Sequence, residues 1–218
     1  MKTKTKKIFS LSVLVFLCIA VFGLVGAVSA QEDTIETILN NRYGGSVNWI
    51  GPLPLTEISF TQTTSVVLVY VDDHQAGNTD PTGWYETDSG IKHQLFATPT
   101  KDDNTQFNPC EEFGMYIDSH DSQSPPNYYT IYSQNSKNPD GGIYARLYQV
   151  TGGDHSGAYV VAFEDLLTTD PNYDGDFNDV VLELKNVNPI PEFATIAIPA
   201  VAVLGLFLFF NKRKHKKE

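Results

Sequence analysis

Through the middle of the chain, short hydrophobic runs alternate with clusters of Asp, Asn, Pro and Gly. Short runs rich in β-branched and aromatic residues, bounded by turn residues, indicate β-strands. The most apolar run is SVVLVYV at residues 65–71, which we predict to be a central strand. Further strands are predicted at residues 90–96, 113–117, 128–132, 142–150, 158–163 and 180–187. This rhythm predicts one all-β domain over residues 31–188, a jelly-roll-like β-sandwich.

One segment departs from this pattern. Ile35, Ile38 and Leu39 follow helical spacing, and Gly44 and Gly45 come directly after them. Glycines at this position commonly end a helix. We therefore expect one short helix within residues 32–44.

The N-terminal end has the pattern of a secretory signal peptide. Four lysines precede an apolar run at residues 8–25, and the small residues Ala27 to Ala30 precede a polar segment. This order predicts residues 1–30 as a signal peptide that is cleaved after Ala30. Because the apolar run is long, an uncleaved signal anchor is the alternative. Both interpretations export the middle of the chain.

The C-terminal end predicts a membrane anchor. Residues 189–192 form a linker, residues 193–210 are apolar apart from Thr195, and residues 211–218 form a basic tail. Eighteen residues of helix span about 27 Å, enough to cross a bilayer core. The basic tail is expected in the cytoplasm and the domain outside, at the cell surface.

The exported part is strongly acidic. Between residues 31 and 190, six Lys and Arg residues face 24 Asp and Glu residues, which gives a formal net charge of −18. Such a surface disfavours nucleic acid and suits cations or a salty exterior. Cys110 is the one cysteine that follows the signal peptide, so it has no partner for an intradomain disulfide, and we expect a buried thiol there.

The acidic residues concentrate most strongly at residues 170–179, which hold four aspartates and two asparagines. Two carboxylates about 5 Å apart repel by roughly 3 kcal/mol at an effective dielectric of 20. Asp170, Asn172 and Asp174 stand at positions one, three and five, and Gly175 stands at position six, as in calcium loops. Oxygen donors without Cys or His favour Ca²⁺ over a transition metal.

The loop differs from an EF-hand at its end. Position twelve, which is usually a bidentate Glu, is Val181, within a run typical of a strand. We therefore expect the loop to join two strands, with the missing carboxylate supplied by Asp179, Glu164 or Asp165. The alternative is a solvated acidic turn without metal. The full set of candidate ligands is Glu164, Asp165, Asp170, Asn172, Asp174, Asp176, Asn178 and Asp179.

Catalytic motifs are weak. The chain has no G-x-S-x-G, H-E-x-x-H or P-loop pattern, and His74 and His120 lie beside aspartates of the kind that polar loops contain by chance. We therefore expect a protein that is not an enzyme. A carbohydrate-active hydrolase remains the alternative, because the spacing of two catalytic carboxylates is a property of the fold.

Four segments resemble the secreted domain of unknown function 4114. They are FGMYID at residues 113–118, YSQNSKNPDG at residues 132–141, YVVAFEDL at residues 159–166 and DGDFNDVV at residues 174–181. The similarity is strongest over residues 113–187 and extends loosely back to residues 66–85. It implies an all-β extracellular domain with a calcium site on Asp174, Asp176, Asn178, Asp179, Glu164 and Asp165. Where that family has a Gly-rich turn, this chain has residues 167–173, which add oxygen donors.

The C-terminus resembles the archaeal PEF-CTERM sorting signal. Pro191, Glu192 and Phe193 precede the apolar span and the basic tail, in the three-part order of that signal. The resemblance implies that an archaeosortase removes the tail and joins the new end to a membrane lipid. It also implies an archaeal source.

These features predict an exported, membrane-anchored surface protein that acts as an envelope binding or adhesion module. Envelope glycan and a surface-layer protein are the expected partners, and a structural envelope component without a ligand is the alternative. If exposed, Trp84 and Tyr85 would form a sugar-binding platform. The interpretation that we favour is that this pair begins a strand and belongs to the core.

Overall fold

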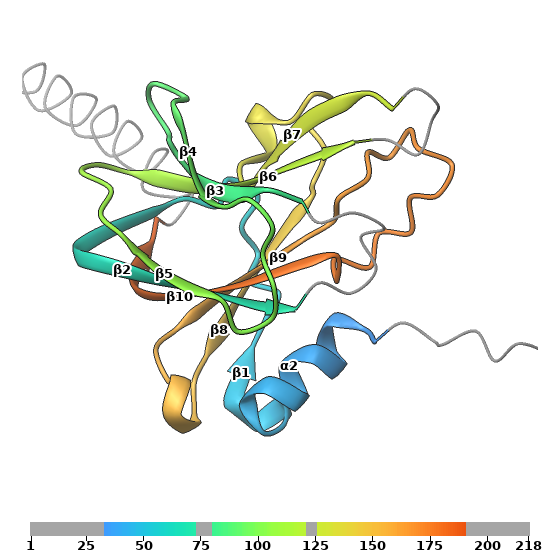
Figure 1. The fold of residues 1–218 in the computed structure, drawn as a ribbon. Helices are drawn as coiled ribbons and strands as arrows, with labels where there is room; N and C mark the ends of the chain where they lie inside the picture. The colour runs from blue at the N-terminus through green and yellow to red at the C-terminus, as the bar shows by residue number, and fades with distance from the viewer. Residues whose placement is uncertain (1–32, 73–79, 121–125, 191–218) are drawn as a thin grey trace, which may run out of the picture. The chain divides into compact units, whose positions relative to one another are not determined.

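The computed structural model describes residues 33–72, 80–120 and 126–190, and these are mostly β structure (Figure 1). The helical elements are α2 (Ile35–Tyr43) and the 3-10 turns η1 (Ser46–Asn48), η2 (Asn135–Lys137) and η3 (Gly153–His155). The strands are β1 (Trp49–Ile50), β2 (Phe60–Asp72), β3 (Thr82–Glu86), β4 (Lys92–Phe96), β5 (Asn104–Phe107), β6 (Phe113–His120), β7 (Tyr128–Tyr132), β8 (Ala145–Val150), β9 (Tyr159–Phe163) and β10 (Val180–Pro189).

Strand pairing follows the order β1-β8-β9-β10-β2-β6-β3-β4, with β5 paired to β2 and β7 paired to β6. Neighbouring strands are antiparallel. Strand β2 pairs with β10 along most of its length, but it pairs with β6 only at Phe60 and Phe113. This narrow connection lets the ladder fold over into two layers.

The inner faces of the two layers form one core. Phe113, Met115 and Ile117 alternate along β6 and join the same buried cluster as Val161 of β9 and Leu182 of β10. Alternate residues of a strand point to one face, so the cluster fills the space between the layers. The prediction of an all-β sandwich is confirmed.

The outer face of β8, β9 and β10 is covered by helix α2. Ile38 and Leu39 of the helix share a buried cluster with Val160, Ala162 and Val181 of the strands. Both faces of β9 and β10 are therefore buried, which explains their continuous apolar sequences. The predicted helix is confirmed. The side chain of Thr34 accepts a hydrogen bond from the Thr37 amide at its start, and Gly44 ends it at φ +77°.

Trp84 and Tyr85 lie in β3 and belong to the core, as favoured. Trp84 is 9% exposed and stacks on His93 with ring centroids 4.0 Å apart, and Tyr85 is fully buried. The tyrosine hydroxyl donates to the side chain of Gln134 at 2.9 Å. The alternative prediction, that these two residues form an exposed sugar-binding platform, is therefore wrong.

Two details differ from the sequence-based expectations. Cys110 is exposed, not buried, because it lies in the turn between β5 and β6 and outside both core clusters. Strands β1 and β5 were not predicted, because β1 has only two residues and the β5 sequence NTQF lacks an apolar run.

Within the described residues, no helix is long and apolar enough to span a bilayer. The predicted signal peptide with Ala30, the Pro191-Glu192-Phe193 motif, the 193–210 span and the basic tail lie outside the described residues, as does His74.

Candidate metal centre

The candidate centre lies where strands β9 and β10 separate. In the β9–β10 ladder, Phe163 pairs with Val180. Glu164 directly follows the first of these residues and Asp179 directly precedes the second, so the register brings their backbones face to face. The amide of Asp165 donates to the carboxylate of Asp179 at 2.9 Å. The end of the ladder thus brings two acidic residues together.

Asp176 reaches the same place from a segment with an unusual backbone conformation. Gly175 at φ +72° and Phe177 at φ +61° both have left-handed backbones on either side of Asp176. Glycine takes this conformation freely, whereas a bulky residue such as Phe rarely does. The glycine at the sixth position of the predicted calcium loop therefore has a left-handed backbone, but residues 173–178 form no assigned turn.

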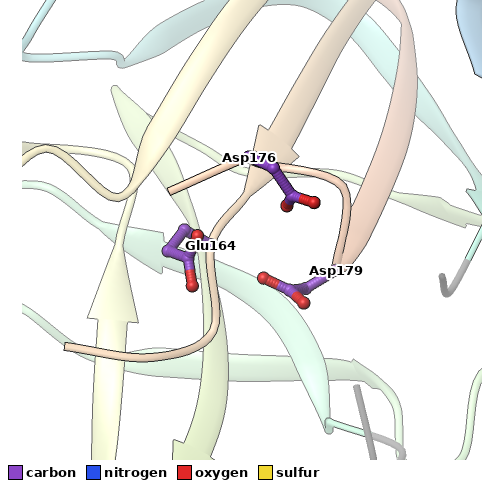
Figure 2. A group of neighbouring side chains, drawn as sticks. All are labelled: Glu164, Asp176 and Asp179. Atoms are coloured by element: carbon purple, nitrogen blue, oxygen red, sulfur yellow. The ribbon is translucent and has the colours of Figure 1, made fainter. Parts of the chain in front are cut away.

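Glu164, Asp176 and Asp179 form the acidic cluster (Figure 2), to which each contributes a carboxylate oxygen, all within 4.8 Å of one another. Figure 2 shows the three carboxylates turned toward a common space. Glu164 is 1% exposed, and its Oε2 is buried with no hydrogen-bond partner. A buried, unpaired carboxylate oxygen is costly in a protein, so this arrangement can hold a metal ion.

The electrostatics of Glu164 reflect this crowding. Burial first, and then the charges of Asp174, Asp165 and Asp176, together raise the pKa of Glu164 to about 8, against a hydrogen bond from the Leu166 amide. The carboxyl therefore holds its proton at neutral pH when no cation is present.

The other two carboxyl groups shift in the same direction. Burial and then the neighbouring charges of Asp165 and Glu164 raise the pKa of Asp179. Burial and Asp174 raise the pKa of Asp176, although Asn178 donates to it from both its backbone and its side chain. A bound cation would remove the repulsion for all three groups.

The remaining predicted ligands lie around this cluster. Asp174 and Asn172 are exposed, and Asp165 is partly buried. Asp170 is 7% exposed and accepts a hydrogen bond from the Asn172 amide at 2.9 Å, which shapes the first turn of the loop. Asn178 is 1% exposed, and its side chain donates to Asp176 at 2.6 Å and to the backbone carbonyl of Asp33 at 2.9 Å.

Asp33 was not anticipated from the sequence. It lies 145 residues before its partner Asn178, and no local pattern connects the two. Phe177 was not anticipated either, since its backbone conformation is one that sequence rules assign to glycine.

A second buried carboxylate, that of Glu183 in β10, is fully partnered. It accepts hydrogen bonds from the Tyr43 hydroxyl at 2.8 Å and the His155 ring at 3.0 Å, and it pairs with Lys185 at 3.1 Å. Burial alone would raise the pKa of Glu183, but these partners outweigh burial and lower it. A cavity of about 260 Å³ lies beside this group, lined by residues 154–158 with Lys185 and Asn186.

Two family models match parts of the chain. Residues 107–186 match the model of a domain of unknown function, DUF4114, and residues 190–214 match the PEF-CTERM archaeal protein sorting domain. The chain therefore contains a segment similar to DUF4114, followed by a segment similar to the PEF-CTERM sorting domain. Both resemblances are thereby confirmed, and the first match contains the whole acidic cluster.

No curated protein and no solved structure gave a significant match to the chain. The PEF-CTERM match indicates a surface protein anchored at its C-terminus. The two matches are to a sorting signal and to a domain without an assigned activity.

The raised pKa of Glu164 predicts an unusual pH dependence for the metal-free protein. Between the ordinary pKa of 4.5 and about 8, the folded state keeps a proton that the unfolded state has lost. The free energy of unfolding should therefore fall as pH rises through this window, by at most about 1.4 kcal/mol per pH unit for one proton. Chemical denaturation of the full-length protein in detergent with a chelator measures it.

The matched variant is Glu164→Gln, which removes one of the titrating groups and should make the pH dependence shallower, while Asp176 and Asp179, whose pKa values are also raised, keep the rest of it. The lowered pKa of Glu183 does not interfere, because its stabilising contribution is complete above pH 4.5 and is lost only at more acidic pH. Stability that rises with pH in the metal-free wild-type protein would contradict the prediction.

Proposed function

We propose that this protein is a cell-surface module whose β-sandwich is stabilised by a calcium ion bound to Glu164, Asp176 and Asp179. The observation that carries the proposal is the convergence of three carboxylates, one of them with a buried oxygen that lacks a partner. Asp174 and Asp165, whose charges raise the pKa of Glu164, are the candidates to complete the ligand set.

The chemistry of these donors supports calcium. Calcium binds six to eight oxygens at 2.3–2.6 Å, so oxygens on opposite sides of the ion lie about 5 Å apart. The cluster, with its oxygens within 4.8 Å of one another, needs little rearrangement to reach that geometry. The donors are hard carboxylate oxygens, which suit calcium better than a transition metal.

Calcium should therefore raise the thermal stability of the full-length protein in detergent. At 100 times the dissociation constant the ion should add about 2.7 kcal/mol, a shift of a few degrees in Tm. The shift should vanish in Glu164→Gln and Asp176→Asn, and it should persist in Asp88→Asn, which changes an exposed carboxylate far from the cluster in sequence. Equal Tm values in calcium and in chelator would show that the loop is a solvated turn.

The C-terminal sorting domain supports a second part of the proposal. We propose that the chain is exported by its N-terminal segment and that an archaeosortase-type enzyme cleaves near Pro191-Glu192-Phe193 and couples the new end to a membrane lipid. Intact mass of the protein from native membranes should show a chain that lacks the basic tail and carries a lipid adduct. A C-terminus that still ends at Glu218 would exclude processing.

We further propose that the module binds an envelope glycan or a surface-layer protein. With Trp84 and Tyr85 in the core, the aromatic group available on the described surface is Tyr128, which is 81% exposed and lies 5.5 Å from the ring of His120. An exposed aromatic ring beside polar groups suits a sugar face.

Tyr128→Ala should weaken binding to envelope glycans on an array by at least severalfold, whereas Val47→Ala, which also removes an exposed apolar side chain, should not. Absence of binding by the wild-type protein would favour a structural envelope role.

A further inference from the structure

Residues 176–179 contact two different parts of the molecule. Asp176 and Asp179 belong to the acidic cluster. Phe177, between them, is 3% exposed and belongs to the buried cluster that also contains Ile35, Ile38 and Leu39 of helix α2. One short segment therefore contributes both to the ion site and to the seat of the helix.

Asn178 makes the connection direct. Its side-chain amide donates to the carboxylate of Asp176 and also to the backbone carbonyl of Asp33, one residue before the helix cap Thr34. It is 1% exposed, so solvent does not replace either bond. Movement of Asp176 toward or away from an ion must therefore move or break the contact that holds the start of the helical segment.

Phe177 is held tightly enough to transmit such a movement. Its backbone has φ +61°, a conformation that costs free energy for a bulky residue unless the surroundings fix it. The guanidinium of Arg146 from β8 lies 3.7 Å from the centre of its ring, on the same outer face that α2 covers. The strained backbone is thus stabilised only while the ring stays packed.

We propose that cation binding at Glu164, Asp176 and Asp179 and the docking of helix α2 on the sandwich are coupled, so that each strengthens the other. The proposal rests on the proposed calcium site. Without the ion, repulsion among the carboxylates pushes Asp176 and Asp179 apart and loosens the segment that carries Phe177 and Asn178. With the ion, the segment is fixed and α2 is held. Thermodynamic linkage requires that loss of helix docking weakens ion binding by the same factor.

The first test needs no variant. Hydrogen exchange of the α2 amides in the full-length protein in detergent is measured with saturating calcium and with chelator. Exchange at residues 38–43 should slow by about fivefold or more in calcium, the usual lower range of coupling between two sites. The β6 amides, which lie in the other layer of the sandwich, report any uniform change in stability and serve as the internal reference.

The second test uses two identical deletions in different places. Leu39→Ala removes a fully buried side chain from the α2 cluster, and Leu147→Ala removes an equally buried one from the core between the layers. Neither residue is a candidate ligand. Calcium titration by calorimetry should show that Leu39→Ala weakens the affinity by about fivefold or more, whereas Leu147→Ala leaves it within twofold.

The outcomes separate the coupling from the site itself. Calcium uptake by the wild-type protein with equal affinities for both variants, and with α2 exchange that changes no more than that of β6, overturns the coupling and leaves the calcium site intact. No uptake by the wild-type protein overturns both. If Leu39→Ala does not fold, the exchange measurement on the wild-type protein decides alone.

Discussion

Repulsion among carboxylates at the open end of the β9–β10 ladder is the constraint on which this part of the molecule depends. Antiparallel pairing forces the residues that flank the last pair, Phe163 and Val180, to lie opposite each other, and both are acidic. Backbone amides and Asn178 donate to the carboxylates, but hydrogen bonds to neutral donors cannot cancel several negative charges in a buried site. A proton or a cation has to do so, and the raised pKa of Glu164 shows the first of these solutions.

The two buried glutamates of adjacent strands make the point by contrast. Glu183 lies under α2 with His155, Lys185 and Tyr43 around it, and its pKa is lowered. Glu164 lies among aspartates, with one oxygen unpartnered, and its pKa is raised. Both are almost fully removed from water. Burial is therefore common to both residues, and the sign of the surrounding charge differs. Positive neighbours give Glu183 its ion pairs inside the protein, whereas negative neighbours leave Glu164 suited to an external cation.

Sequence patterns predicted the elements whose physics is local. The apolar runs of β9 and β10 and the spacing of Ile35, Ile38 and Leu39 follow from burial on one or both faces, and the left-handed backbone at Gly175 is one that glycine adopts freely. Sequence patterns did not predict which of the acidic residues come together. Asp170 and Asn172 fit a linear calcium-loop pattern, yet the structure brings together Glu164, Asp176 and Asp179, because strand register and not linear spacing sets which carboxylates meet. The contact of Asn178 with Asp33 joins the two ends of the described domain and has no local signature.

The position of β10 links the cluster to the anchor. This strand is central, flanked by β9 and β2, and it ends at Pro189, immediately before the matched sorting domain. The amide of Ile190 still donates to the carbonyl of Ser59 at 3.0 Å, so the chain is paired up to that boundary. Strand β9 pairs with β10 only from Val180 to Leu184, whereas β2 pairs with it from Val181 to Pro189, so the end of β10 nearest the sorting domain is held by β2. The acidic cluster lies at the opposite end of the same strand, at Asp179. An ion at the proposed site would join the β9 and β10 backbones at the point where their ladder ends.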